Sequence, residues 1–247
     1  MVQLVPLLSK VQHLWLTLLV CLLLSPLLGG CVDYDLSVRF DSQTHGSLTQ
    51  TLHLNDRFLA LNEAGADRIF QQLTTRAKAL SGKTHRLDKD MLQIVLPFHN
   101  GAQLVEQFNT FYGGNDEADG GGLSLPGAPS MSAHLALQQN NYIFVLRNRL
   151  TYDFQIQPVD QIVESPLSDL SWLNLDFHLT TPWGLIAASP PAEVAATDHT
   201  ARWHLAANQP QHIEADFWVP SPIGIGAGAI ALVCLLGYYI KYRGTAV

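Results

Sequence analysis

The stretch Val32-Asp33-Tyr34-Asp35-Leu36-Ser37-Val38-Arg39-Phe40-Asp41 alternates apolar and polar side chains without a break. Successive side chains of a strand point to opposite faces of a sheet, so the pattern predicts a strand with one buried and one solvated face. Such half-buried strands are typical of antiparallel sheets. A turn over residues 43–46, followed by apolar Leu48, Leu52 and Leu54, predicts that the chain returns as the second strand of a hairpin.

Two helices are expected after this hairpin, with a strand over residues 91–96 between them. Apolar residues at helical spacing predict the first helix, with Asn62 as its N-cap and Gly82 at its C-terminal end. Asn100 is predicted to cap a second helix over residues 101–112. Its apolar stripe is interpreted as core contact and consists of Leu104, Val105, Phe108 and Phe111.

The rest of the body is predicted to be strands. Two of them cover residues 131–138 and 142–157, with Gln139-Asn140-Asn141 as the turn between them. Another covers residues 173–179, and a final hairpin is predicted from residues 201–205 and 213–219. The fold class expected is therefore α+β, a mainly antiparallel sheet with two inserted helices.

A glycine-rich segment over residues 113–130 is predicted to be a flexible loop inside this domain. Asp116, Glu117 and Asp119 lie in it, so a calcium loop is the alternative. The segment lacks oxygen ligands at alternate positions and a closing glutamate, which disfavours calcium. The loop interpretation is therefore preferred.

Residues 1–30 resemble a lipoprotein signal peptide. Lys10 precedes the apolar run from Val11 to Leu28, and Pro26 interrupts that run near its end. Leu28-Gly29-Gly30-Cys31 then resembles a lipobox, which predicts cleavage before Cys31 and attachment of diacylglycerol, with palmitate, to its thiol. The alternative is an uncleaved signal anchor with a chance cysteine. The extracytoplasmic domain is expected to cover residues 31–219.

A second apolar segment, residues 220–241, is predicted to be a transmembrane helix. Its uncharged part, Pro222–Ile240, has a length of nearly 30 Å at about 1.5 Å per residue, which matches the hydrocarbon thickness. Lys241 and Arg243 follow it, so the positive-inside rule places the tail, residues 242–247, in the cytoplasm. The body then lies on the periplasmic or lumenal side of a cell inner membrane or a thylakoid membrane.

The predicted span contains a G-x-x-x-G pair, Gly224 with Gly228. Small residues at this spacing let two membrane helices approach closely, so the pair is a candidate helix–helix packing site. Glycine is also common in such helices without any such role. Both interpretations are kept.

Charge and cysteine usage exclude several classes of function. The chain has 21 acidic and 14 basic residues, and all the acids but only 11 of the bases lie in residues 32–217, whose net charge is therefore −10. A nucleic-acid-binding surface would be strongly basic, so no nucleic-acid partner is expected. None of the three cysteines lies in the body, which excludes disulfides and thiolate metal sites there.

The residues give no catalytic constellation, and no cofactor or metal is expected. His53, His134, His178 and His204 stand at polar positions of alternating strands, which favours solvated faces over metal ligation. Arg147 and Arg149 share one strand face about 7 Å apart and could bind a phosphate or acidic headgroup. The favoured alternative is that they form ion pairs with acids on a neighbouring strand.

Several sequence blocks resemble the LppM-like lipoprotein domain of actinobacteria, and more closely its cyanobacterial and plastid relatives. They are the lipobox running into residues 32–36, and residues 177–184, 201–205 and 213–220 before one span. The resemblance implies a membrane-tethered extracytoplasmic domain, with lipid or glycolipid contact in some members. It implies no catalytic residues.

Three functions follow as hypotheses. The first is a non-enzymatic binding or assembly module that acts on membrane complexes or at the bilayer surface. The second is a lipid or glycolipid carrier with an apolar cleft between sheet and helices, and the third, more remote, is a membrane-bound hydrolase. The expected partners are the membrane itself and a membrane protein or lipid.

Overall fold

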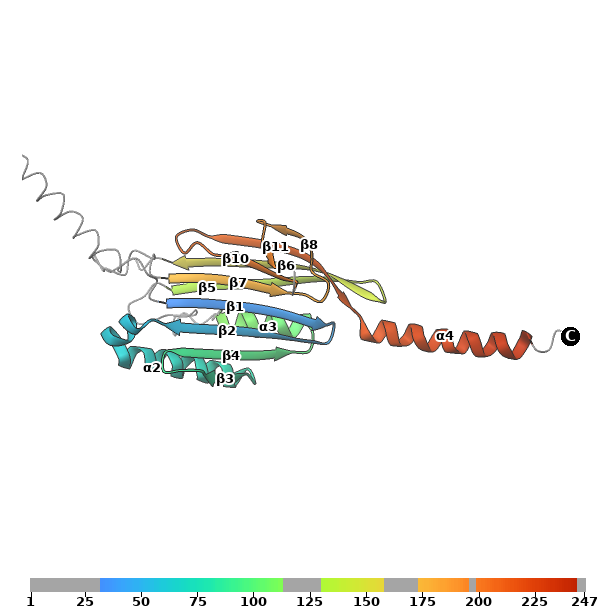
Figure 1. Ribbon diagram of the computed structural model, residues 1–247, viewed down its shortest axis with the longest axis horizontal. Coiled ribbons are helices and arrows are strands. Elements are labelled where there is room, and N and C mark those ends of the chain that lie inside the picture. Colours follow the sequence, from blue (N-terminus) through green and yellow to red (C-terminus); the bar gives the residue numbers. More distant parts are fainter. Residues whose placement is uncertain (1–31, 113–129, 158–172, 196–198, 244–247) are drawn as a thin grey trace, which may run out of the picture.

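The computed structural model describes residues 32–112, 130–157, 173–195 and 199–243. These residues form two β-sheets, two helices that belong to the same body, and a C-terminal helix that projects from it (Figure 1). The expected α+β class is confirmed, and most strand pairs are antiparallel. The strands do not form one sheet, however, because the second half of the chain builds most of a separate layer.

The larger sheet has seven strands in the order β3-β4-β2-β1-β7-β10-β9. Its strand bounds are β1 Val32–Ser42, β2 His45–Leu54, β3 Lys83–Arg86, β4 Met91–Phe98, β7 Leu173–Thr180, β9 Glu193–Ala195 and β10 Thr200–His204. The predicted hairpin of β1 and β2 is confirmed, and β1 also pairs with β7 in parallel. The alternating residues of β1 from Val32 to Phe40 are buried on one face, as their pattern predicts.

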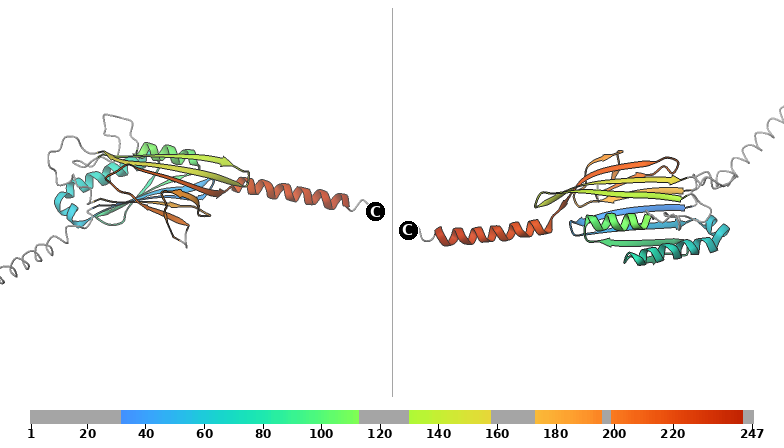
Figure 2. Two further views of the ribbon diagram at one scale, coloured as in Figure 1. Left: turned by 90° about the horizontal axis from the view of Figure 1, so that it is seen from above. Right: turned by 180° about the vertical axis from the view of Figure 1, so that it is seen from behind.

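The smaller sheet has four antiparallel strands in the order β5-β6-β11-β8. Its strand bounds are β5 Ser130–Asn141, β6 Val145–Gln157, β8 Leu185–Ser189 and β11 Gln211–Pro220. Figure 2 shows it packed across the larger sheet, with helix α3 in the same layer beside β5. Stacked rings of Tyr152 and Phe177, 4.6 Å apart, and tilted rings of Phe40 and Phe217, 5.0 Å apart, join the two sheets.

Helix α3, Gly101–Tyr112, has the predicted bounds and the predicted cap, because the Gln103 backbone NH donates to the Asn100 side chain at 2.8 Å. Its stripe packs as core, with Leu104 and Phe108 fully buried. The Asn109 side chain bonds both backbone groups of Leu135 at 2.9 Å, so α3 covers the edge of β5. This cover satisfies backbone groups that an edge strand otherwise exposes.

Helix α2, Asp56–Ala79, begins earlier than predicted. Asn62 is not its cap but lies inside the helix, because the helix starts as soon as β2 ends and its first turns precede the periodic apolar residues. At the other end Ser81, not Gly82, takes the left-handed conformation, with φ of 59°. The Gly82 NH bonds the Ala77 carbonyl at 2.8 Å and closes the helix there.

Two further predictions in the second half are wrong. Gln139-Asn140-Asn141 does not turn the chain, because these residues continue β5 in register with β6 and the turn is Tyr142-Ile143-Phe144. The final hairpin does not form, because β10 pairs with β7 in the larger sheet whereas β11 pairs with β6 in the smaller one. The link between β10 and β11 therefore crosses from one layer to the other.

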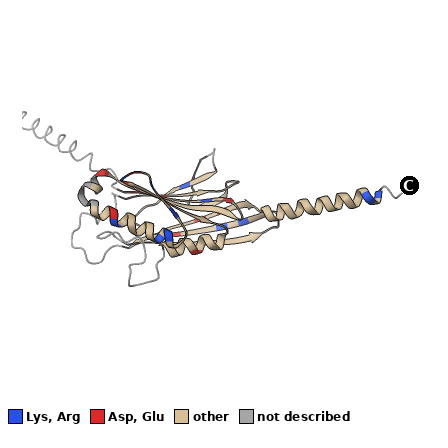
Figure 3. Cartoon of the chain, turned by 90° about the horizontal axis from the view of Figure 1, so that it is seen from below, with Lys and Arg blue, Asp and Glu red and all other residues tan. Residues whose placement is uncertain are grey.

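The predicted C-terminal span is confirmed as a long apolar helix. Helix α4, Pro222–Arg243, contains an 18-residue stretch with a mean hydropathy of 2.1 and is long enough to cross a membrane. Figure 3 shows that it has no charged residue until its last turn. The predicted signal peptide, the lipobox, the end of the tail (residues 244–247) and the predicted loop, apart from Ser130 at the start of β5, lie outside the described residues.

Candidate functional site

Among the described residues, the core packs against one face of the larger sheet, and we call the other face the open face. Strand alternation brings polar side chains of four adjacent strands together there. They are Asp33, Asp35, Ser37, Arg39, Thr51, His53, Asn174, Asp176, His178, Thr180, Arg202 and His204. The open face therefore brings carboxylates and histidines of four adjacent strands together.

Asp176 is the most buried acid of the open face, with a side chain only 4% exposed. Arg202 donates to one of its oxygens at 2.6 Å, and the other lies 3.2 Å from Nδ1 of His204. Burial alone would raise the pKa of Asp176, but the hydrogen bonds and charges of Arg202 and His204 outweigh burial and lower it. The carboxylate is therefore held ionised by two groups of the neighbouring strand.

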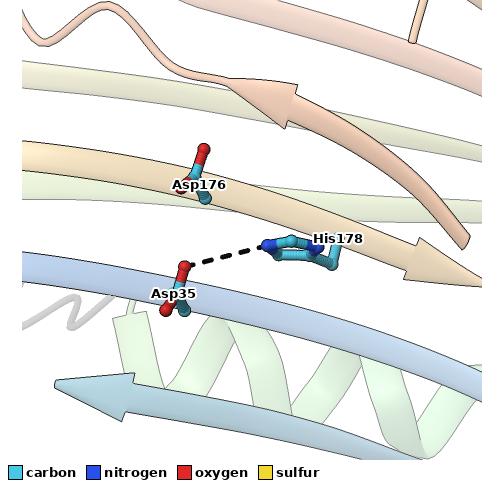
Figure 4. Close-up of side chains that lie close together, drawn as sticks. All are labelled: Asp35, Asp176 and His178. Atoms are coloured by element: carbon cyan, nitrogen blue, oxygen red, sulfur yellow. Dashed lines mark ion pairs between the residues drawn. The ribbon is translucent and has the colours of Figure 1, made fainter. Parts of the chain in front are cut away.

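Asp35, Asp176 and His178 lie close together on adjacent strands (Figure 4), with one ligand atom from each within 4.8 Å of the others. His178 Nε2 is 3.7 Å from the Asp35 carboxylate. Such a group can hold a metal ion, but both oxygens of Asp176 already face Arg202 and His204. A cation would have to displace those two side chains, so we assign the cluster to ion pairing.

His53 lies between two carboxylates. Its Nδ1 is 3.2 Å from Asp33 and its Nε2 is 3.2 Å from Asp90, so a protonated ring can donate to an acid on each side. The hydrogen bond to Asp33 has the largest effect and raises the pKa of His53, burial opposes it, and Asp90 adds to the rise. His53 thereby links β2 to β1 and to the residue that precedes β4.

The two predicted anion-contact residues, Arg147 and Arg149, both pair with Asp216 on β11. Arg149 contacts the carboxylate through two nitrogens at 2.9 and 3.1 Å, and Arg147 through one at 2.9 Å. The hydrogen bond from Arg149 lowers the pKa of Asp216 most, and Arg147 adds to it against the effect of burial. The alternative of ion pairs with a neighbouring strand is thus confirmed.

The two predicted helix-packing glycines, Gly224 and Gly228, face the turn between β5 and β6. A Cβ on Gly224 would lie 1.6 Å from the carbonyl oxygen of Ile143, and a Cβ on Gly228 would lie 2.6 Å from the ring of Phe144. The intervening Gly226 has no such neighbour within 4 Å. Both glycines are therefore in close contact with this turn, and packing of α4 on a second membrane helix stays a prediction.

The start of β1 and the start of α4 lie at opposite ends of the body (Figure 1). The far end of β1 meets α4, because the Gln43 NH bonds the Pro220 carbonyl at 3.3 Å and the Ser221 hydroxyl bonds the Gln43 side chain at 2.6 Å. Val32 is ten residues back along β1 from Ser42, about 33 Å at the rise of a strand. Cys31, the predicted lipid site, precedes Val32 directly.

Sequence reasoning missed two parts of these surfaces. It did not single out Asp176, which stands at a polar position of an alternating strand and owes its importance to partners on another strand. It also assigned Tyr142–Phe144 to the start of a strand, because apolar residues rarely form turns. Asp33 and Asp35 were correctly placed on one strand face.

The fold and these surfaces define a membrane-associated α+β module with one apolar terminal helix. The sequence profile of the DUF3153 family, described as a protein of unknown function, matches residues 36–246. The chain therefore belongs to that family, for which no catalytic activity is described.

Comparison with solved structures adds one remote likeness. The NMR structure of the folded domain of Mycobacterium tuberculosis LppM matches at 11% identity and a TM-score of 0.40, covering 78% of this chain and 93% of that domain. The resemblance seen in the sequence concerns the same kind of domain, and this structural likeness is remote. No curated protein matches the chain.

Proposed function

We propose that this protein is a non-enzymatic, membrane-tethered binding module, and that its open face binds a basic extracytoplasmic segment of a membrane protein. The observation that carries the proposal is the open face itself, where carboxylates of adjacent strands gather away from the core. Asp33 and Asp35 have side chains 45% and 50% exposed, so their oxygens are accessible to Lys or Arg of a partner.

The sheet beneath the open face suits recognition because it is rigid. The core residues on its opposite face are almost completely buried, with Leu36, Leu175 and Phe177 at 1% exposure or less. Side chains that are fixed before binding lose less conformational entropy when a partner docks. The net charge of −10 over residues 32–217 adds a long-range attraction for a basic partner.

Helix α4 supplies the tether. A body fixed to the bilayer meets membrane proteins at a far higher effective concentration than a free one, so a modest interface suffices. Lys241 and Arg243 at the end of α4 support a cytoplasmic C-terminus, with the body on the other side of the membrane. The inner membrane of a cell and the thylakoid membrane both fit this orientation.

The described residues favour binding over the two alternatives. Within the described part of the open face, the histidines and arginines pair with carboxylates, an arrangement that fixes a surface and activates no nucleophile. A lipid carrier needs an apolar cavity between the layers. In the described part of that space the rings of Phe108, Tyr152 and Phe177 pack together, with Tyr152 stacked on Phe177 and edge-on to Phe108.

Site-specific photocrosslinking in native membranes tests the proposal. A benzophenone amino acid at Ser37, on the open face, is expected to give a reproducible adduct with a membrane protein. The same group at His134, on the exposed side of β5, is the matched control and is expected to give none with that protein. The double substitution Asp33→Asn and Asp35→Asn should lower the yield of the adduct from position 37. Equal adducts from both positions, or none from Ser37, would contradict the proposal.

We also propose that Cys31 is acylated, as its lipobox predicts. Because Val32 and α4 lie at opposite ends of the body, two anchors in one bilayer require the strands to lie along the membrane surface. A body held by α4 alone can stand upright with Val32 about 33 Å from the membrane. The intact mass of the membrane-extracted chain tests the acylation of Cys31. A chain that starts at Met1 and carries no acyl mass would refute it.

A further inference from the structure

The turn between β5 and β6 is built from residues that turns normally avoid. We call Tyr142-Ile143-Phe144 the hairpin tip, and its residues are 54%, 67% and 51% exposed. Ile143 takes a left-handed conformation with φ of 68°, which is unfavourable for a β-branched residue and common only for Gly, Asn and Asp. Three exposed apolar side chains on a strained turn are unexplained by the packing of the body.

The hairpin tip lies along the first turns of α4. The Ser221 NH donates to the Phe144 carbonyl at 2.9 Å, and Gly224 approaches the Ile143 carbonyl too closely for any side chain to fit. Further along, Gly228 leaves room for the ring of Phe144. Gly228 is six residues beyond Pro222, so this contact lies about 9 Å along the helix from its start. The hairpin tip therefore lies beside α4 for more than one helical turn.

The composition around the hairpin tip suits a bilayer. Residues 135–146 contain no charged side chain, and the first charge beyond them, Arg147, is paired with Asp216. The Tyr142 ring meets that of Trp218 at 5.5 Å, beside the junction with α4. Tyr and Trp at this level are typical of the membrane–water interface, while Ile and Phe favour the hydrocarbon below it.

We propose that the hairpin tip is a second membrane-inserted element, with Ile143 and Phe144 in contact with lipid beside α4. Helix α4, with 22 residues, is only slightly longer than the hydrocarbon core is thick, so its first turns lie at the bilayer surface when it spans. Since the tip is fixed alongside those turns, α4 cannot span the membrane without bringing the tip into the lipid. The occupant of this apolar surface is therefore the bilayer, continuous with the lipid around α4.

This insertion gives Gly224 and Gly228 a role. They let a β-hairpin pack on a membrane helix. Interfacial apolar side chains inserted by several ångströms commonly anchor peripheral elements in this way. The inference concerns the membrane end of the body and is independent of what the open face binds.

The test uses the full chain reconstituted in phosphatidylcholine vesicles. A benzophenone amino acid at Ile143 is expected to form lipid adducts, detected by mass, several-fold more often than the same group at Asn208. Asn208 is the control because it is also exposed and lies in the loop between β10 and β11. Lipid adducts no more frequent at position 143 than at 208 would overturn the proposal. Adducts from position 143 only to a second copy of the chain would overturn it too.

A matched pair of glycine variants tests the coupling to α4. Gly228→Val places side-chain atoms where the Phe144 ring lies, so it should push the tip from the helix and reduce lipid adducts at position 143 several-fold. Gly226→Val, on a face with no neighbour within 4 Å, should leave them unchanged. Equal adduct yields in both variants would refute the packing of the tip on α4. The adducts of the otherwise unaltered chain test insertion separately, should Gly228→Val fail to fold.

Discussion

Replacing Asp176 by Asn is expected to destabilise the body measurably, because it removes a buried charge that holds two side chains of β10. The Asn side chain has nearly the same shape, so the core beneath the sheet is left intact. What changes is that Arg202 loses a 2.6 Å ion pair and His204 loses a carboxylate acceptor at 3.2 Å. Hydrogen bonds to charged groups contribute about 1.5–3 kcal/mol each.

The expected loss is smaller than the sum of two such bonds. The side chains of Arg202 and His204 are 51% and 68% exposed, so water replaces part of what they lose, and the amide oxygen of the introduced side chain still accepts one bond. We therefore expect Asp176→Asn to lower the free energy of unfolding by about 2 kcal/mol. Asp35→Asn is the matched control on the adjacent strand, where a single 3.7 Å contact between partly exposed groups predicts less than about 0.5 kcal/mol.

Urea unfolding of the full chain in mild detergent measures both variants. Tryptophan fluorescence follows the transition, since Trp203 is buried on β10 next to Phe177. With a slope near 2 kcal/mol per molar urea, the midpoint of Asp176→Asn should fall by about 1 M. The pH dependence gives a second signature. Because the pKa of Asp176 is lowered below 3.8 in the folded chain, its stabilising effect is complete above that pH and is lost as the pH falls further.

The difference in urea midpoint between the original chain and Asp176→Asn should therefore be constant near neutral pH and shrink only in strong acid. Equal midpoints for Asp176→Asn and Asp35→Asn at neutral pH would show that the buried ion pair does not stabilise the sheet. A difference in urea midpoint that persists unchanged well below pH 3.8 would show that Asp176 stabilises the body through packing and not through charge.

Three further outcomes are expected. The pKa of His53, followed by NMR of its ring protons, should lie above 6.5, and Asp33→Asn should lower that pKa. The contribution of protonated His53 to stability is complete below pH 6.5 and is lost as the pH rises through the folded-state pKa. An unaltered titration of His53 in Asp33→Asn would exclude the hydrogen bond to Asp33 as the cause of the raised pKa. Asp216→Ala should destabilise the chain by about 1–2 kcal/mol in urea because it leaves both arginines of β6 without their acid, whereas Glu214→Ala on the same face should cost under about 0.5 kcal/mol; equal effects would contradict the pairing. Gly46→Ala should cost about 1–3 kcal/mol, because its methyl would lie 2.2 Å from the Phe98 ring and 2.5 Å from the Arg39 carbonyl oxygen, while Gly226→Ala should leave the urea midpoint unchanged. A neutral Gly46→Ala would contradict the close packing at this position.

Strand and helix periodicity predicted most elements correctly because each depends on neighbours a few residues away. The alternation in β1, the stripe and cap of α3 and the apolar length of α4 are all such local signals. The turn between β5 and β6 was misplaced because turn chemistry pointed to Asn140 and Asn141, whereas apolar Tyr142–Phe144 forms the turn. Residues that break a local rule in this way, as these apolar turn residues do, often form a functional surface that contacts a partner or a membrane.

The sequence by itself determined the α+β class, the burial of β1 on one face, the acidic charge of the body and the apolar C-terminal helix. Only the tertiary structure decided that the strands divide into two sheets, that Asp216 pairs with both arginines of β6, and that Gly224 and Gly228 pack on the hairpin tip. The physical reason is that strand pairing joins residues far apart in the chain. Asp33 and His53 or Arg149 and Asp216 become neighbours only once the register is fixed. Alternation specifies which face a side chain takes but not which strand lies beside it.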